Sequence, residues 1–256
     1  MLQTYCSRPK YHPEERRFRR RDRKGTLVSE HWFISGANRG LGLEFARQLT
    51  ARGDVVTASV RSESSARALG AQLATQHAAV RTVMFDVRDE AEIAAAAQVV
   101  KAPIDVLVAN AGAAGPPNQS ATGLDFAAAL DLFSINALGP LRLIKALLPK
   151  LGGPNPRIVL VSSQLGATTS LKASSMVYCA SKAALNKFAQ CLAAELQPRG
   201  VTVVAVHPGW ARTDMGGPEA PLAPSRSVEG IIAIVDALTI EDTGSFLDYR
   251  GRVEAW

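Results

Sequence analysis

Apolar strand-like runs alternate with amphipathic helix-like runs along most of this sequence, and this alternation constrains the fold more than any other feature. The strand-like runs lie at 26–36, 54–60, 78–87, 104–112, 156–163, 200–209 and 245–256. Helical patterns fill the intervals between them, at 42–53, 64–76, 89–102, 123–151, 177–192 and 227–239. Strands that alternate with helices predict a parallel sheet with helices packed on both of its faces.

The longest helical pattern, at 123–151, contains Pro140, which we expect to kink or divide that helix. The most loop-like segments are 113–120 and 208–226, the second of which is rich in Pro and Gly. We find no internal repeat and no sign of a second domain. Residues 25–256 are therefore predicted to form a single doubly wound α/β domain.

The charge of the chain is concentrated at its start. The 256 residues carry a net charge of +6, and residues 1–24 alone hold nine Lys or Arg and three Asp or Glu. The other 232 residues hold 20 of each sign, so the body is neutral and is not expected to bind nucleic acid. We interpret residues 1–24 as a basic, disordered leader; the alternative is a patch that binds nucleic acid or an anionic membrane.

The three cysteines, Cys6, Cys179 and Cys191, show no spacing typical of a metal site. Such a sparse, odd number suggests a reducing compartment, and we expect a cytoplasmic protein. No apolar run looks long enough to span a bilayer, which takes about 20 residues, so no membrane association is expected.

A glycine-rich turn follows the first strand-like run. Gly36, Gly40 and Gly42 lie directly before a helix, where glycine lets backbone approach a phosphate and the helix N-terminus attracts an anion. The first strand-to-helix turn of a doubly wound sheet is where a dinucleotide pyrophosphate binds. The alternative is a tight turn with a purely structural role.

Two arginines bear on the choice of dinucleotide. Sites for NAD usually carry an acid after the second strand, but this strand is followed by Arg61, and Arg39 lies inside the glycine turn. Two guanidinium groups near a ribose 2′-phosphate would favour NADP. The alternative is that both arginines are solvated.

Other polar residues stand where later strands end. Asp86, with the Val87 backbone beside it, could accept a hydrogen bond from an adenine amine or cap the next helix. Asn110 and Gly112 follow the fourth strand, at the edge of the sheet where ligands bind. Ser162 and Ser163 end the next one, where a hydroxyl could polarise a carbonyl or cap the loop.

Two polar groups lie in apolar helices. Asn136 could brace the main chain, hold a water or cap the break at Pro140. Tyr178 and Lys182 are four residues apart and so share one helix face. An ammonium one turn away lowers the pKa of a phenol, which would let Tyr178 give a proton to a carbonyl oxygen. Taken alone, the pair could also be a surface lysine beside a half-buried tyrosine.

Together these motifs, in their order along 27–256, resemble the short-chain dehydrogenase/reductase family. The segments "SGANRGLGLEFARQL", "PGWARTDMGGPEAPL" and "GSFLDYRGRVEAW" look more narrowly like its C-factor and sniffer-type carbonyl reductase branch. The resemblance implies a Rossmann domain and hydride transfer between NADP(H), preferred over NAD(H), and a small carbonyl or secondary alcohol. It also implies a homodimer or tetramer. A cofactor-binding signalling protein with little turnover is the alternative.

The family pattern implies specific roles. Tyr178 would be the acid/base, Lys182 would bind the nicotinamide ribose and tune Tyr178, Ser163 would hold the substrate oxygen, and Asn136 would support a relay water. The implied cofactor contacts are Ser35, Gly36, Asn38, Arg39, Gly40, Leu41, Gly42, Arg61, Asp86, Val87, Asn110, Ala111, Gly112, Tyr178, Lys182, Pro208, Gly209 and Thr213. No metal is implied.

The chain departs from the family pattern in several places, one of which is the unusual Cys179 beside Tyr178. Ser35 stands where the family usually has Thr, which preserves a hydroxyl. Ser163 precedes Tyr178 by fifteen residues, slightly more than is common, so either serine of the pair could be the catalytic one, and we take Ser163. The Arg-rich leader has no counterpart in the family.

Overall fold

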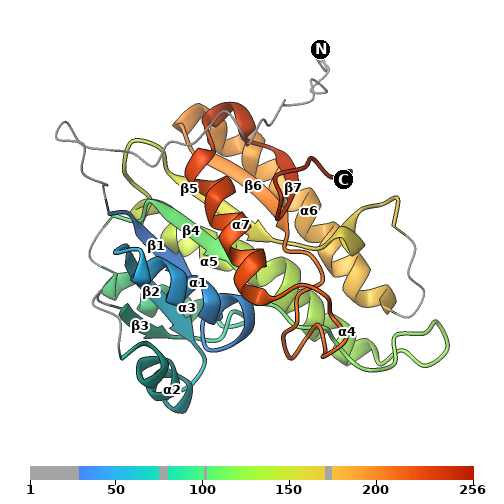
Figure 1. The fold of residues 1–256 in the computed structure, drawn as a ribbon. Coiled ribbons are helices and arrows are strands. Elements are labelled where there is room, and N and C mark those ends of the chain that lie inside the picture. Colours follow the sequence, from blue (N-terminus) through green and yellow to red (C-terminus); the bar gives the residue numbers. More distant parts are fainter. Residues whose placement is uncertain (1–28, 75–79, 101–102, 171–174) are drawn as a thin grey trace.

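Seven parallel strands form one sheet in the order β3-β2-β1-β4-β5-β6-β7 (Figure 1). The computed structural model describes residues 29–74, 80–100, 103–170 and 175–256. The strands are β1 (His31–Ile34), β2 (Val55–Val60), β3 (Val80–Met84), β4 (Val106–Ala109), β5 (Arg157–Val161), β6 (Thr202–His207) and β7 (Ser245–Asp248). The predicted parallel doubly wound sheet is thus confirmed. The proposed leader, 1–24, lies outside the described residues.

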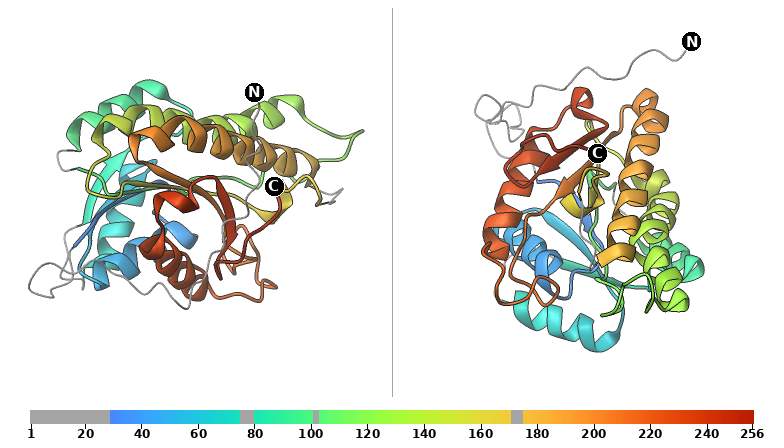
Figure 2. Two further views of the ribbon diagram at one scale, coloured as in Figure 1. Left: turned by 90° about the horizontal axis from the view of Figure 1, so that it is seen from above. Right: turned by 90° about the vertical axis from the view of Figure 1, so that its right-hand side faces the viewer.

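Helices cover both faces of the sheet (Figure 2). One face carries α1 (Gly40–Ala51), α2 (Glu63–Leu73) and α7 (Pro224–Ala237), whose apolar side chains join one core cluster. The other carries α3 (Glu90–Val99), α5 (Gly139–Leu147) and α6 (Met176–Leu196), which contribute to a second cluster. The sheet is therefore the middle layer of three.

The strands have apolar residues at successive positions because both of their faces are buried. In β1, Trp32 and Ile34 pack in the first cluster, and Phe33 packs in the second. All three are at most 1% exposed. Burying a side chain of this size contributes about 1.5–3 kcal/mol, so the strand is strongly fixed in register.

The predicted long helix at 123–151 is divided just before Pro140. It comprises α4 (Phe126–Phe133), a π-helical turn η1 (Ser134–Leu138), α5 and a 3₁₀ turn η2 (Leu148–Lys150). Proline has no N–H and its ring collides with the preceding helical turn, so the wider π turn accommodates it. The division was expected, but the π turn was not, and it holds Asn136 in its middle.

The run Phe126–Lys150 is 25 residues long and has a mean hydropathy of 1.3 in its most apolar window. By length and composition it could cross a membrane, which corrects our expectation that no apolar run is long enough. Within this fold, Leu143, Ile144 and Leu147 are buried in the second core cluster. The α5 part of the run therefore packs against the sheet.

The topology of the sheet identifies the carboxyl ends of β1 and β4 as the place for a binding site. β1 pairs with β2 on one side and with β4 on the other, so the strand order reverses between β1 and β4. The loops that leave the carboxyl ends of these two strands diverge to opposite faces, which opens a crevice. The predicted site residues follow the carboxyl ends of β1 to β6 around that crevice.

Candidate active site

One cavity lies at the carboxyl edge of the strands, around the point where the strand order reverses. It is lined by Gly36, Asn38, Arg39, Gly40, Leu41, Ser59, Val60, Arg61, Phe85, Asp86, Val87, Asn110, Ala111, Gly112, Ala113, Ile135, Val161, Ser162, Tyr178, Lys182, Pro208, Thr213, Asp214 and Met215. Most of the residues predicted from separate motifs therefore meet around one space.

The glycine turn between β1 and α1 has no room for a side chain at Gly42. Gly36 has a φ of +68°, a region that favours glycine. A Cβ on Gly42 would lie 2.2 Å from the carbonyl oxygen of Gly36 and 2.7 Å from Nδ2 of Asn110. The cavity thus borders the N-terminus of α1 at Gly40 and Leu41, and a helix N-terminus attracts a phosphate.

Ser35 and Asn110 fasten this turn to β4. The Ser35 hydroxyl accepts hydrogen bonds from the backbone N–H of Asn110 at 2.9 Å and of Ala111 at 3.0 Å. Nδ2 of Asn110 donates to the carbonyl oxygens of Ser35 at 2.9 Å and Gly36 at 3.2 Å. Ser35 is 1% exposed and does not line the cavity, so the hydroxyl at this position shapes the turn.

The two arginines predicted to read the ribose differ in their surroundings. Arg39 forms an ion pair with Asp214, with Nη1 and Oδ2 2.9 Å apart. Arg61 is exposed at the end of β2 and makes no hydrogen bond or ion pair with any other residue the structure describes. Both side chains line the cavity. Arg39 is thus engaged by a carboxylate, while the Arg61 guanidinium remains available.

Asp86 does not cap α3, which was one of the two roles considered for it. The cap is Asp89, which accepts from the N–H groups of Ala91 and Glu92 at 2.9 Å. Oδ2 of Asp86 instead pairs with Nη2 of Arg88 at 2.7 Å. Hydrogen bonds from Arg88 are the main cause of a lowered pKa at Asp86, so this side chain is a fixed carboxylate at the cavity.

Val87, which follows Asp86, is buried against the turn that precedes Pro140. A Cβ on Gly139 would lie 3.0 Å from Cβ of Val87. The close approach fixes the wall of the cavity between β3 and α5.

Asn136 is fully buried in the π turn and braces the main chain beyond β4. Its Oδ1 accepts from the N–H of Ala113 at 2.9 Å, and its Nδ2 donates to the carbonyl oxygen of Ala113 at 2.9 Å and to the Ser181 hydroxyl at 3.0 Å. It does not line the cavity. Asn136 thus connects the segment after β4 with α6, and it caps no helix break.

Ser162 and Ser163 have different partners. The Ser162 hydroxyl donates to Oδ1 of Asn186 in α6 at 2.5 Å. The Ser163 hydroxyl accepts from the N–H of Leu165 at 3.1 Å, and it also lowers the pKa of Tyr178 through a hydrogen bond. Ser162 lines the cavity, but the hydroxyl that faces Tyr178 belongs to Ser163.

Tyr178 and Lys182 lie in the first part of α6. Nζ of Lys182 donates to the carbonyl oxygen of Val161 at 2.9 Å and is 6.0 Å from the centroid of the Tyr178 ring. The backbone N–H of Tyr178 is held at 2.9 Å by Oε1 of Gln119. A Cβ on Gly166 would collide with the backbone of Lys182 at 2.7 Å, so the turn after Ser163 packs directly on α6.

Burial shifts the pKa values of these two groups in opposite directions. It raises the pKa of Tyr178 above 10.0, although Ser163 opposes this. It lowers the pKa of Lys182 from 10.5 to about 8. This differs from our expectation that Lys182 lowers the pKa of the phenol, because loss of hydration dominates in the buried helix face.

The loop after β6 contributes part of the cavity lining. Pro208 and Thr213 line the cavity, but Gly209 does not. At Gly209, with a φ of +75°, a Cβ would lie 2.6 Å from Leu222 and 3.0 Å from the ring of Tyr249. The Gly209 position is thus required by packing of the loop, and our prediction that it faces the cofactor finds no support in the cavity lining.

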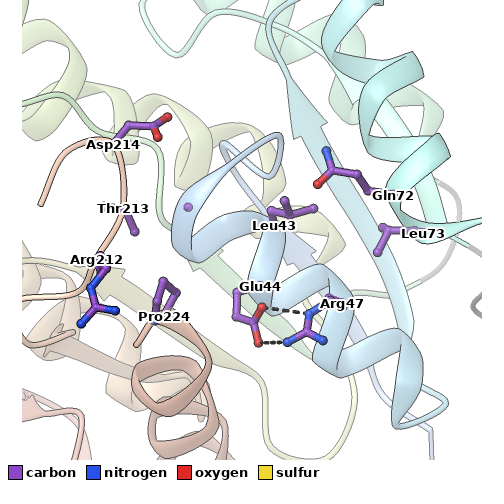
Figure 3. A pocket seen from close by; sticks show the side chains of 10 residues that line it. Leu43, Glu44, Arg47, Gln72, Leu73, Arg212, Thr213, Asp214 and Pro224 are labelled. Atoms are coloured by element: carbon purple, nitrogen blue, oxygen red, sulfur yellow. Dashed lines mark hydrogen bonds and ion pairs between the residues drawn. The ribbon is translucent and has the colours of Figure 1, made fainter. Parts of the chain in front are cut away.

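A second cavity, of about 460 Å³, lies on the other side of the glycine turn (Figure 3). It is bordered by α1, the end of α2 and the loop after β6, and it carries the ion pair of Glu44 with Arg47. Gly40, Thr213 and Asp214 border both cavities. None of the candidate catalytic side chains faces it. Within the described ranges, no three His, Cys, Asp or Glu residues are grouped so as to hold a metal ion.

A model of the short chain dehydrogenase family matches residues 30–221, well over half of the chain. The chain belongs to this family. Among curated relatives, the C-signal protein of Myxococcus xanthus is 41% identical over 164 residues, which are 63% of this chain and 98% of that protein.

Solved structures extend the similarity over the whole sheet. The NADPH-bound carbonyl reductase from chicken fatty liver is 31% identical, with a TM-score of 0.82 over 90% of this chain and all of that one. The carbonyl reductase Sniffer of D. melanogaster is 28% identical, with a TM-score of 0.83 over the same shares. The resemblance to the carbonyl reductase branch of the short-chain dehydrogenase family, inferred from motifs, is confirmed.

Several residues that line the cavity at the carboxyl edge of the strands were not predicted from the sequence. They are Ser59, Val60, Phe85, Ala113, Ile135, Val161, Asp214 and Met215. Most are apolar residues, which carry no signal apart from their place. Asp214 had a signal, since it is an acid inside the Pro- and Gly-rich loop next to Thr213.

Proposed function

We propose that this short-chain dehydrogenase transfers hydride between NADP(H) and a small carbonyl or secondary alcohol, with Tyr178 as the acid/base. The observation that carries the proposal is the meeting of Tyr178, Lys182 and Ser163 at the carboxyl end of β5, beside the glycine turn. The similarity to an NADPH-bound carbonyl reductase supports it.

The residues present suit a dinucleotide. The backbone cradle at Gly36 and Gly42 would hold the pyrophosphate, and the carboxylate of Asp86 would accept from the adenine amine. Arg39 and Arg61 line the same cavity and would pair with a 2′-phosphate, so we propose that NADP(H) is preferred over NAD(H). When bound, the reduced nicotinamide supplies the hydride.

Tyr178 provides the proton. Because burial raises its pKa, the phenol stays protonated at neutral pH and can donate from Oη to the carbonyl oxygen as that oxygen gains electron density. The Ser163 hydroxyl, which reaches the same phenol, holds that oxygen in place. In the reverse direction, the phenolate form would accept the proton of the alcohol.

Lys182 provides the positive charge. With a pKa of about 8, its ammonium group is mostly protonated at pH 7, and no carboxylate pairs with it in the part of the chain that is described. It can therefore stabilise the phenolate left after proton donation and bind a ribose hydroxyl. Asn136 keeps the segment after β4 against α6 and would support the water that returns the proton.

A cofactor-binding signalling protein of the C-factor type is less well supported. The similarity to the C-signal protein of Myxococcus xanthus motivates it. A protein that only binds the dinucleotide has no need of a buried phenol beside a buried ammonium. We further propose a cytoplasmic homodimer or tetramer, with residues 1–24 playing no part in the reaction.

A panel of carbonyl compounds tests the proposed function. Each aldehyde or ketone is incubated with the full chain and NADPH, and the loss of NADPH absorbance is followed; the series is repeated with NADH. The proposal predicts turnover of at least one compound, faster with NADPH. Binding of NADPH without turnover of any compound would favour the signalling alternative.

A further inference from the structure

The ion pair between Arg39 and Asp214 joins two segments that are 175 residues apart, across the edge of the cofactor cavity. Arg39 is the residue before α1 in the glycine turn, and Asp214 lies in the loop after β6. Both line the cavity, and both side chains are exposed, at 61% and 71%. Nothing in the proposed reaction uses Asp214.

The position of Asp214 is set by its own loop. The N–H of Gly217 donates to the carbonyl oxygen of Thr213 at 2.9 Å, and the N–H of Gly216 donates to the Thr213 hydroxyl at 3.2 Å. The methyl group of Thr213 in turn rests 3.4 Å from the place of a Cβ on Gly40. Figure 3 shows Thr213 and Asp214 together on this loop, next to the start of α1.

The loop thus carries a carboxylate to a fixed place beside the glycine turn. Arg39, in contrast, is held at its end by Asp214 and is otherwise exposed. The long arginine side chain is therefore the part that can move when another anion arrives.

We propose that Asp214 competes with the ribose 2′-phosphate of NADP(H) for the guanidinium of Arg39, and so limits the preference for NADP(H) over NAD(H). This inference rests on the proposed function, in which Arg39 binds that phosphate. The carboxylate of Asp214 and the 2′-phosphate are both anions, so they repel each other. Each of them is stabilised by pairing with the guanidinium of Arg39. NAD(H) lacks the phosphate and leaves the ion pair undisturbed.

The competition does not remove the preference for NADP(H). An exposed ion pair is weak, whereas a phosphate offers more charge and more acceptor oxygens to the guanidinium. Arg61 also lines the cavity and forms no ion pair within the described residues, although its charge acts on the Asp86 carboxylate. Asp214 is therefore expected to set the size of the preference, while the two arginines set its sign.

The test measures dissociation constants of the full chain for NADPH and NADH by fluorescence titration at fixed low salt. Asp214→Asn removes the charge and keeps the shape. It should tighten NADPH binding by about two- to fivefold, the range expected when an exposed ion pair is released. NADH binding should stay within about twofold, since any change there reports only general repulsion.

A matched control and a double-mutant cycle isolate the role of Arg39. Glu229→Gln removes another exposed carboxylate, paired with Arg226 at 2.8 Å in α7 and outside the cavity lining, and should change neither constant. In the Arg39→Ala background, Asp214→Asn should no longer tighten NADPH binding. Asp214→Ala should repeat the effect of Asp214→Asn if both variants keep the melting temperature.

Three results would overturn the inference. Weaker NADPH binding in Asp214→Asn would mean that Asp214 holds Arg39 in its binding position. Equal gains for NADPH and NADH, or a gain that persists without Arg39, would mean that Asp214 acts as a general negative charge. If the wild type binds both cofactors equally and Arg39→Ala changes neither, the proposed NADP preference itself fails, which is distinct from a failure at Asp214.

Discussion

The ammonium nitrogen of Lys182 lies 6.0 Å from the centroid of the Tyr178 ring and donates its hydrogen bond to the carbonyl oxygen of Val161. Burial raises the pKa of the phenol and lowers that of the ammonium to about 8. The ordinary pKa values of a phenol and an ammonium group lie close together near 10, and burial moves the two values apart. At neutral pH the helix face presents a protonated phenol beside a cation.

The buried charge of Lys182 should make stability depend on pH. Its pKa in the folded chain, about 8, is below the ordinary 10.5, so the unfolded chain binds more protons between these values. Stability therefore rises with pH across that window, and the penalty of burying the charge is fully present below pH 8.

Lys182→Met removes the buried charge and with it this penalty. The free energy of unfolding of the variant is compared with that of the wild type at pH 7 and at pH 9.5. The gain of the variant should be larger at pH 7 by about 2 kcal/mol, which corresponds to several degrees of melting temperature for a domain of this size. A difference that does not vary with pH would mean that Lys182 is not desolvated. Lys187→Met, at an exposed position of the same helix, is the control.

The two serines after β5 should separate into two phenotypes. Ser163→Ala should lower kcat by about 10²-fold or more, because it removes a donor to the reacting oxygen. It should lower the stability by only about 1 kcal/mol, because the N–H of Leu165 loses its partner. Ser162→Ala should lower the stability by about 1–3 kcal/mol and keep most of the activity, since it strips a partner from buried Asn186. The reverse assignment of the two effects would show that Ser162 contacts the substrate.

Arg61 should control the choice of cofactor. Arg61→Asp replaces an attraction to the 2′-phosphate by a repulsion and offers the NAD ribose an acceptor. NADPH should bind at least about tenfold more tightly than NADH in the wild type, since charge-assisted bonds contribute roughly 1.5–3 kcal/mol each. The order should be reversed in the variant. Equal affinities in the wild type at fixed low salt would mean that Arg61 faces solvent.

Residues 1–24 should be dispensable. They contain nine basic residues and few apolar ones, and the rest of the chain is balanced in charge without them. A chain that starts at Lys24 should keep the melting temperature and the activity of the full sequence. A loss of several degrees would indicate that the segment packs on the domain.

The fold could be read from the sequence because burial of both sheet faces leaves continuous apolar runs, as in β4 and β5. The π turn around Asn136 could not, because its cause is the packing of Pro140 against the preceding turn and no residue pattern marks it. Similarly, Asp86 and Asp89 lie three residues apart and either could cap α3 by its residue type. The structure shows that Asp89 is the cap.

The candidate site was predictable where a motif fixes a backbone shape, as at Gly42, or where spacing fixes a helix face, as for Tyr178 and Lys182. Partners distant in the sequence were not. The ion pair of Arg39 with Asp214 depends on how the loop after β6 folds back on the glycine turn. The raised pKa of Tyr178 depends on burial, which the sequence does not quantify.

The most direct test of the account is the rate of NADPH oxidation by Tyr178→Phe, measured with the best carbonyl compound of the panel. The ring remains for packing and the transferable proton is lost, so kcat should fall by about 10²–10⁴-fold while the dissociation constant for NADPH changes little. Activity above about a tenth of wild type, with NADPH binding intact, would contradict the assignment of Tyr178 as the proton donor.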